Sequence, residues 1–204
     1  MNRTLGVLIS GRGTNLQAII DAIAERRLNA TIGVVISNRP DAAGLERVRR
    51  AGVRSVVIGH KGFATRDDFD RAVVAELRAS GVGLVCLAGF MRLLSPVFIE
   101  AFPNAILNIH PALLPAFPGL DAQRQAWDHG VKVSGATVHF VTGELDNGPI
   151  VMQAAVHVED DDTPESLAAR SLEVEHQIYP AAIAYVLEGE WKILGRRVVK
   201  VTRH

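Results

Sequence analysis

The chain has 204 residues, of which 48% are hydrophobic and 22% charged, a composition typical of a soluble globular protein with a continuous core. Lys plus Arg and Asp plus Glu both number 22, so bulk charge gives no reason to expect nucleic acid or an acidic membrane as a partner. The single cysteine, Cys86, excludes an intrachain disulfide and lies in an apolar run that predicts a buried, inert thiol. The sequence contains no signal-peptide pattern and no membrane-spanning run, so we expect a cytoplasmic protein.

The first half of the chain alternates apolar strand patterns with helical patterns. Strands are expected at residues 5–9, 31–37, 53–58 and 82–88, and helices at residues 16–26, 41–51 and 65–79. Wholly apolar strands that alternate with helices are typical of a parallel sheet covered on both faces. The predicted fold class is therefore α/β, with a Rossmann-like, mostly parallel twisted sheet that binds ligands beyond the carboxyl ends of its strands.

The pattern changes in the second half, where an antiparallel C-terminal extension is expected. After a strand at 105–110 and a short helix at 121–129, two antiparallel strands are predicted at 133–141 and 149–158. A long helix follows, capped near Thr163 and reaching about residue 187, with Pro180 as a candidate interruption; a small hairpin is expected at 191–201. Because no repeat or linker separates the halves, we expect residues 1–204 to form a single domain.

A glycine-rich turn, Ser10-Gly11-Arg12-Gly13-Thr14-Asn15, joins the first strand to the first helix. Such a turn presents backbone N–H groups and a helix N-terminus to an anion, usually phosphate. A dinucleotide site is disfavoured, because Leu16 stands where that motif requires a third glycine and the second strand ends in Ser37-Asn38 without an acidic residue. A monophosphate site and a plain strand-to-helix turn remain the two interpretations.

Asn108 and His110 form a polar pair at the end of the strand at 105–110. Residues two apart in a strand point to the same side, so an amide and an imidazole would face one space. Such a pair can supply an oxyanion donor and a proton-transfer group, although an isolated Asn-x-His is more often two satisfied polar residues at a strand exit. Asp146, in a turn-like sequence, could hold the imidazole in one tautomer and stabilise its protonated form.

The sequence offers no convincing covalent nucleophile. It has no Gly-x-Ser-x-Gly elbow, and Cys86 is expected to be buried. The seven histidines are scattered, without His-x-x-x-His or paired-cysteine spacing, so no metal is expected. Asn108, His110 and Asp146 therefore favour direct transfer between two bound substrates through attack on a carbonyl carbon.

Four motifs occur in a fixed order along the chain. They are Ile9-Ser10-Gly11-x-Gly13-Thr14-Asn15-Leu16-Gln17-Ala18-Ile19, Leu87-Ala88-Gly89-Phe90-Met91-Arg92, Asn108-Ile109-His110-Pro111-x-Leu113-Leu114-Pro115, and Gly135-Ala136-Thr137-Val138-His139-Phe140-Val141 through Asp146-x-Gly148. Through them the chain resembles the phosphoribosylglycinamide formyltransferases over nearly its whole length. Those enzymes transfer a formyl group from 10-formyltetrahydrofolate, a co-substrate, to the amine of glycinamide ribonucleotide in purine synthesis.

The resemblance implies a formyltransferase fold with a nucleotide-binding half at about 1–103 and a folate-binding, catalytic half at about 104–204. It implies small-molecule substrates, no nucleic acid, no membrane, no metal, and a monomer or homodimer. The ribonucleotide would contact Gly13, Thr14, Asn15 and Glu175. The formyl-folate would contact Arg66, Met91, Arg92, Leu93, Leu94, Asn108, Thr142, Gly143, Glu144, Leu145 and Asp146. For Arg66, a solvated helix residue is the alternative interpretation.

The mechanism implied by the resemblance assigns a task to each catalytic residue. Asn108 and a protonated His110 would stabilise the oxyanion that forms when the amine attacks the formyl carbon. Asp146 would keep His110 charged and position a water that carries the proton to the departing folate nitrogen. Whether His110 acts as a charged stabiliser or as the proton carrier is left open.

Two other functions are compatible with parts of the pattern. In a formyltetrahydrofolate deformylase, water would replace the amine; Pro111 and Pro118-Gly119-Leu120 follow the transferase pattern instead, and no preceding regulatory domain is expected. A non-catalytic folate- or nucleotide-binding module would not need all three catalytic residues. The chain departs from some relatives at Thr14, Asp121, Gln123, Gly143 and Leu172, which affects details of substrate contact. The Leu114-Pro115 bond is a candidate for the cis form.

Overall fold

The computed structural model describes residues 2–201, which form two compact units that divide between Leu107 and Asn108. This division lies close to the boundary between halves that the sequence suggests near residue 103. Whether the chain acts as one domain over residues 1–204 stays a prediction. No helix in the described part of the chain is long and apolar enough to cross a membrane.

The first unit contains a parallel sheet, as the apolar strand patterns predicted. Its strands follow the order β3-β2-β1-β4. Val7 in β1 is paired with Val35 on one side and with Cys86 on the other, and all three side chains are buried. The prediction of a buried Cys86 is therefore confirmed. The bounds are β1 Thr4–Ile9, β2 Thr31–Ser37, β3 Ser55–Val57 and β4 Leu84–Leu87.

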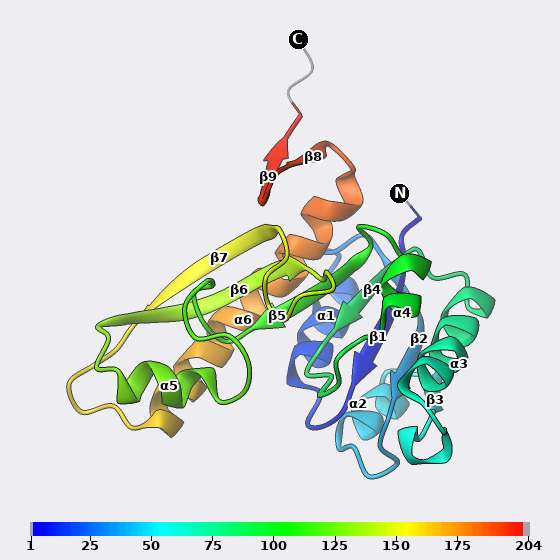
Figure 1. The fold of residues 1–204 in the computed structure, drawn as a ribbon, viewed down its shortest axis with the longest axis horizontal. Helices are drawn as coiled ribbons and strands as arrows, with labels where there is room; N and C mark the ends of the chain where they lie inside the picture. Colours follow the sequence, from blue (N-terminus) through cyan, green and yellow to red (C-terminus); the bar gives the residue numbers. More distant parts are fainter. Residues whose placement is uncertain (1, 202–204) are drawn as a thin grey trace. The chain divides into compact units, whose positions relative to one another are not determined.

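Helices cover both faces of this sheet, which confirms the α/β class (Figure 1). Right-handed crossovers place α1 and α2 on one face and α3 and α4 on the other, and each pair is in contact. A Cβ atom at Gly6 of β1 would overlap Leu77 of α3, so this helix packs closely on the central strand. The bounds are α1 Thr14–Ala24, α2 Gly44–Arg50, η1 His60–Gly62, α3 Arg66–Ala79 and α4 Pro96–Ala101.

The sequence analysis missed α4 and the 3-10 helix η1. α4 has six residues, with Pro96 in its first turn, and η1 has three. Elements of one or two turns are too short to show a helical period, so hydrophobic spacing cannot identify them.

The second unit contains the predicted antiparallel extension. β6 pairs with β7 antiparallel, with Thr137 opposite Gln153, and β8 pairs with β9 as the expected hairpin. β9 also meets β7 in a parallel pairing between Ile150 and Arg197, which the sequence did not indicate. The bounds are β5 Ile106–His110, α5 Ala122–Asp128, β6 Val133–Phe140, β7 Ile150–His157, α6 Pro164–Glu188, β8 Trp191–Leu194 and β9 Arg197–Lys200. β5 spans the division between the units.

The long helix α6 begins with the predicted cap. Thr163 Oγ1 accepts a hydrogen bond from the backbone N–H of Ser166, and the Ser166 hydroxyl accepts one in return from the N–H of Thr163. The helix continues through Pro180 without interruption and ends at Gly189. Pro180 and its neighbour Tyr179 are buried, so packing of this face against β6 and β7 outweighs the hydrogen bond lost at proline.

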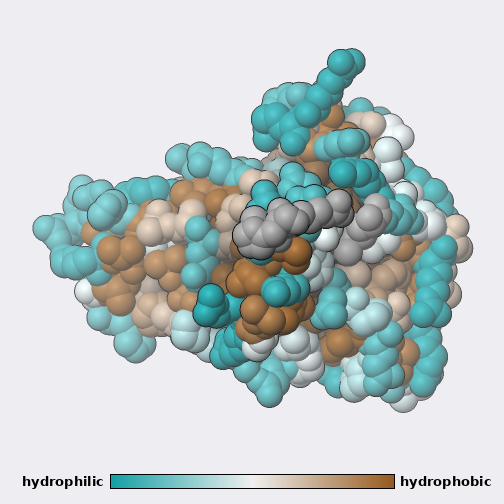
Figure 2. All heavy atoms as spheres, turned by 90° about the horizontal axis from the view of Figure 1, so that it is seen from above, coloured by the Kyte–Doolittle hydropathy of each residue, from teal (hydrophilic) through white to brown (hydrophobic). Residues whose placement is uncertain are grey.

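Hydrophobic residues also reach the surface of the second unit. Most residues of β7 are only half-buried or exposed, and Val133 at the start of β6 is exposed. In Figure 2, hydrophobic surface is visible at the left, the side on which Figure 1 draws β6 and β7. Exposed apolar residues of this kind are common on soluble proteins and do not by themselves identify a partner.

Candidate functional site

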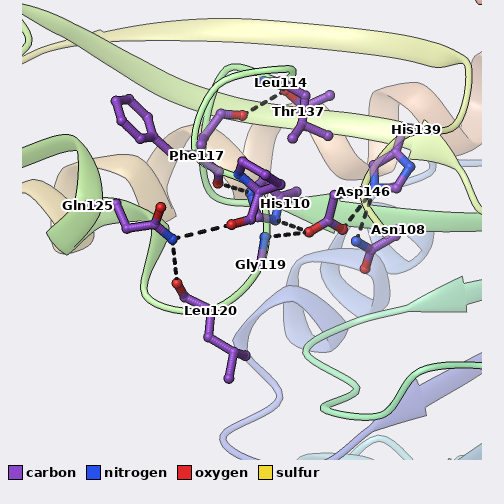
Figure 3. A network of polar contacts seen from close by, with 12 residues as sticks. Asn108, His110, Leu114, Phe117, Gly119, Leu120, Gln125, Thr137, His139 and Asp146 are labelled. Atoms are coloured by element: carbon purple, nitrogen blue, oxygen red, sulfur yellow. Dashed lines mark hydrogen bonds and ion pairs between the residues drawn. The ribbon is translucent and has the colours of Figure 1, made fainter. Parts of the chain in front are cut away.

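The second unit brings Asn108, His110 and Asp146 into one cluster. Asn108 and His110 come from the carboxyl end of β5, and Asp146 comes from the turn between β6 and β7 (Figure 3). Asp146 has a φ of 48°, which lies in the left-handed region. In the same turn a Cβ atom at Gly148 would overlap the carbonyl oxygen of Phe140, so glycine is required for the close return of the chain.

His110 is almost completely buried, and both of its ring nitrogens face protein groups. Nε2 lies 2.8 Å from the carbonyl oxygen of Phe117, and Nδ1 lies 3.4 Å from Asp146 Oδ2. A carbonyl oxygen only accepts hydrogen bonds, so the Nε2 atom carries a proton. The sequence-based expectation that Asp146 partners this histidine therefore agrees with the geometry.

The surroundings of His110, which the sequence-based mechanism expects to be charged, act on its pKa in opposite directions. Burial lowers the pKa of His110, and the neighbouring His139 ring acts in the same direction. The hydrogen bond to Phe117 and the charge of Asp146 raise the pKa, but the net result lies below the ordinary value of 6.5. The pKa of His110 is thus lowered by burial, while its Nδ1 atom faces the Asp146 carboxylate.

Asp146 keeps its negative charge despite partial burial. Burial raises the pKa of its carboxyl group, whereas the contact with His139, the hydrogen bond from Gly119 and the facing His110 ring lower it. The lowering prevails, and the pKa lies below the ordinary value of 3.8. The Gly119 N–H donates to Oδ2 at 2.8 Å, which fixes the carboxylate on the side of His110.

His139 is a buried member of this cluster that the sequence analysis did not single out. Its Nε2 lies 3.2 Å from Asn108 Nδ2 and 3.6 Å from Asp146 Oδ1. His139 and Thr137 lie two residues apart in β6, so their side chains point to the same side of the strand. This spacing was visible in the sequence. A histidine in an apolar strand is usually a satisfied core residue, and only the contact with Asn108 distinguishes this one.

Thr137 fixes the segment that follows His110. Its hydroxyl donates to the carbonyl of Ala112 at 2.7 Å and accepts from the N–H of Leu114 at 3.0 Å. Gln153, opposite it in β7, donates to Thr137 at 2.9 Å and to the carbonyl of Leu114 at 2.9 Å. The Leu114-Pro115 bond is cis, which answers the question raised by the sequence. This network anchors the chain that leads from His110 to Phe117.

In the first unit, the glycine-rich turn has the geometry of an anion-binding helix N-terminus. Gly13 is the N-cap of α1 with a φ of 67°, and it offers no side chain to the N–H groups of the first turn. A Cβ atom there would lie 2.7 Å from Gly44 Cα, so the turn packs directly on α2. Arg47 of α2 donates from Nε to the carbonyl of Arg12 at 2.9 Å, which adds a cation beside the turn that sequence reasoning missed.

The residues predicted to contact the formyl-folate lie in four segments, at Arg66, at 91–94, at Asn108 and at 142–146. Arg66 is exposed at the start of α3. The segment from Met91 to Leu94 is held at Met91, whose N–H donates to Ser10 Oγ at 2.9 Å, while the Arg92 guanidinium lies 5.0 Å from the centre of the Phe69 ring. Met91 and Leu93 are exposed.

The remaining predicted contacts lie in the second unit. Residues 142–145 form the turn that leads to Asp146, with Gly143, Glu144 and Leu145 exposed, and Glu175 is buried in α6. In the part of the chain that the structure describes, no group of three or more His, Cys, Asp or Glu side chains is placed to hold a metal ion.

Residues 3–183 match a family of proteins described as formyl transferase. A relative named phosphoribosylglycinamide formyltransferase, from Escherichia coli (strain K12), is 45% identical over 187 residues, which span 92% of this chain and 88% of that protein. A relative in Drosophila melanogaster, named trifunctional purine biosynthetic protein adenosine-3, is 46% identical over 189 residues. The match spans 92% of this chain but only 14% of that longer protein.

Solved structures show the same fold. Glycinamide ribonucleotide transformylase 1 from Symbiobacterium toebii superposes with a TM-score of 0.96 at 56% sequence identity. The superposition covers 98% of this chain and 95% of that one. Phosphoribosylglycinamide formyltransferase from Brucella melitensis gives a TM-score of 0.88 at 43% identity, covering 95% of this chain and 99% of that one.

Proposed function

The chain belongs to the formyl transferase family, and we propose that it transfers a formyl group from 10-formyltetrahydrofolate to the amine of glycinamide ribonucleotide. The names of the E. coli and Symbiobacterium toebii relatives support this substrate, and the name of the Drosophila relative supports a place in purine synthesis. The single observation that carries the proposal is the cluster of Asn108, His110 and Asp146, because it combines an amide, an imidazole and a carboxylate.

The chemical step begins when the substrate amine attacks the formyl carbon. The carbonyl oxygen becomes an oxyanion, and the Asn108 amide donates a hydrogen bond to it. The attacking nitrogen becomes positively charged and must lose a proton, whereas the folate nitrogen must gain one as its bond to the formyl carbon breaks. The products are the formamide and tetrahydrofolate, with no net gain or loss of protons.

His110 and Asp146 serve the proton transfer. In its neutral form His110 would accept a proton at Nδ1, and that proton would then lie between the ring and Asp146 Oδ2. The charged ring would be stabilised by the carboxylate on one side and by the Phe117 carbonyl on the other. A water held by Asp146 would connect the substrate nitrogens to this pair. The lowered pKa of His110 supports a ring that gains and then loses a proton during the reaction.

The residues proposed to bind the two substrates are the ones expected from the sequence. The ribonucleotide phosphate would bind the first-turn N–H groups at Gly13, Thr14 and Asn15, supported by the uncapped start of α1 and the nearby Arg47, and Glu175 would bind the ribose. The formyl-folate would bind the main-chain groups at 91–94 and 142–146, with Arg66 as a further contact. The balanced charge supports small-molecule substrates without nucleic acid or membrane. Cytoplasmic localisation and a monomer or homodimer complete the proposal.

The decisive experiment measures loss of 10-formyltetrahydrofolate with and without glycinamide ribonucleotide. The proposal expects turnover only when the ribonucleotide is present, with formylated ribonucleotide as the product. Equal turnover without the ribonucleotide would identify a hydrolase. Tight binding of both ligands without product would identify a binding module.

A further inference from the structure

We infer that His139 is a positioning residue that orients the Asn108 amide so that an N–H group faces the formyl oxygen. The inference rests on the proposed role of Asn108 as the oxyanion donor. His139 is 2% exposed, comes from β6, and has no part in the proton transfer proposed for His110 and Asp146. Its contact with Asn108 is shown in Figure 3.

The contacts of His139 fix the position of its ring proton. Asn108 Nδ2, at 3.2 Å, carries only donor hydrogens, so His139 Nε2 must accept with a lone pair. The proton of a neutral ring is then on Nδ1, which lies 2.9 Å from the carbonyl oxygen of Phe140 and donates to it. Both nitrogens are satisfied in this tautomer and in no other neutral one.

This tautomer determines which atom of the Asn108 amide, Nδ2 or Oδ1, faces His139. If the amide were reversed, its oxygen would meet the lone pair of His139 Nε2 and the contact would become repulsive. In the favoured orientation one hydrogen of Nδ2 is used by His139, and the second remains for a substrate oxygen. An amide with no such anchor would sample both orientations, and in the reversed one its oxygen would face the developing negative charge.

Asp146 provides the alternative partner for the same nitrogen. Its Oδ1 lies 3.6 Å from His139 Nε2, a distance longer than a hydrogen bond. A proton on Nε2 would turn this contact into a pairing with Asp146 and would remove the acceptor of the Asn108 N–H group. The location of the proton on His139 therefore decides which residue its Nε2 atom contacts. Without a proton Nε2 accepts from Asn108, and with a proton it pairs with Asp146.

The tautomer is tested directly in the unaltered protein. In protein labelled with 15N-histidine, the spectrum at neutral pH should show His139 with a protonated Nδ1 and a lone pair on Nε2. The signals of His139 are identified by their loss in the His139→Gln protein. A proton on Nε2 would overturn the inference.

Two substitutions separate the contacts of His139. Glutamine places an acceptor oxygen near the position of Nε2, whereas asparagine reaches only the position of Nδ1. We expect His139→Asn to lower kcat by about 10-fold or more, a part of the roughly 10²–10³-fold cost of removing an oxyanion donor. His139→Gln should lose less than about 5-fold, and KM for both substrates should change by less than about 3-fold in either variant. Equal losses in the two variants would overturn the inference.

A double-mutant cycle with Asn108→Ala identifies the residue through which His139 acts. If His139 acts through Asn108, His139→Asn should cause no further loss of kcat in the Asn108→Ala background. Multiplicative losses would overturn the inference. His157→Asn, at an exposed position in β7, is the matched control for the chemical change and should retain full activity.

The same set of variants separates this inference from the proposed function. Wild-type turnover in Asn108→Ala would refute the proposed catalytic role of Asn108. A large loss in Asn108→Ala together with full activity in His139→Asn would leave that role intact and refute the positioning role of His139.

Discussion

The backbone N–H of Gly119 donates a 2.8 Å hydrogen bond to Asp146 through Oδ2, the same oxygen that faces His110. A segment distant in sequence thus holds the carboxylate in place and lowers the pKa of its carboxyl group. The same hydrogen bond therefore supports both the position and the charge of Asp146, and a neutral side chain of the same shape can remove the charge while it keeps an acceptor oxygen.

Asp146→Asn should lower kcat by about 100-fold or more, within the range seen when a charged group is removed from a transition-state site. Asparagine retains an oxygen that can accept from Gly119, so the loss reports the missing charge opposite His110. Steady-state kinetics measures the loss, and thermal unfolding checks that the variant stays folded. Near-normal turnover would remove the carboxylate from the proposed proton transfer.

Asn108→Ala should raise the barrier by about 2.7–4 kcal/mol, because it removes a donor to the oxyanion. The side chain is only half-buried, so the fold should survive the substitution. We expect the change in kcat, with KM for the ribonucleotide nearly constant. An increase of KM with unchanged kcat would instead indicate that Asn108 only binds the substrate.

His110 should make the protein less stable in mild acid. Its pKa in the folded state lies below 6.5, so the unfolded chain binds more protons than the folded one as the pH falls through 6.5. The stability associated with the neutral ring is therefore present above pH 6.5 and is lost below it. Asp146, whose pKa is lowered from 3.8, loses its contribution only at more acidic pH.

Thermal unfolding of the wild type and of His110→Gln between pH 7.5 and about pH 5 tests this effect. The melting temperature of the wild type should fall more steeply below pH 6.5 than that of the variant. Parallel profiles would mean that the folded protein does not resist protonation of His110.

Thr137→Val should reduce stability by about 1–3 kcal/mol, because it retains the shape of the side chain but leaves buried polar groups without their partner. The affected groups are the carbonyl of Ala112 and the N–H of Leu114. Thr137→Ser keeps the hydroxyl and should be close to the wild type. Urea unfolding measures the difference, and equal stability of the two variants would show that the hydroxyl is dispensable.

Gly13→Ala should destabilise the first unit by about 1–2 kcal/mol, since a side chain is strained at a φ of 67° and its Cβ atom would also press on Gly44. KM for the ribonucleotide should rise as the turn shifts. Gly11→Ala is the matched control for stability, because a Cβ atom there meets nothing within 4 Å. A melting temperature of Gly13→Ala equal to that of Gly11→Ala would contradict the strain.

Local periodicity in the sequence was sufficient for the α/β class and for the strand that ends at Asn108 and His110, whereas Asp146 was chosen for the chemistry of a carboxylate beside an imidazole. These features repeat over a few residues, as in the buried strands around Val7 and Val35. The errors were also local: α4 was too short to show a period, and α6 passes through Pro180 because packing compensates for the lost hydrogen bond.

Only the tertiary structure decided the state of the candidate site. The lowered pKa of His110 follows from its burial, which outweighs the opposing effects of Phe117 and Asp146, and the role inferred for His139 follows from its contact with Asn108. These interactions join β5, β6 and the segments that follow them. The contacting residues lie too far apart in the sequence for a local pattern to reveal the contact. The sequence by itself determined which chemical groups are present and which strand carries them. Packing determined their protonation and orientation, because desolvation and hydrogen-bond partners exist only in the folded chain.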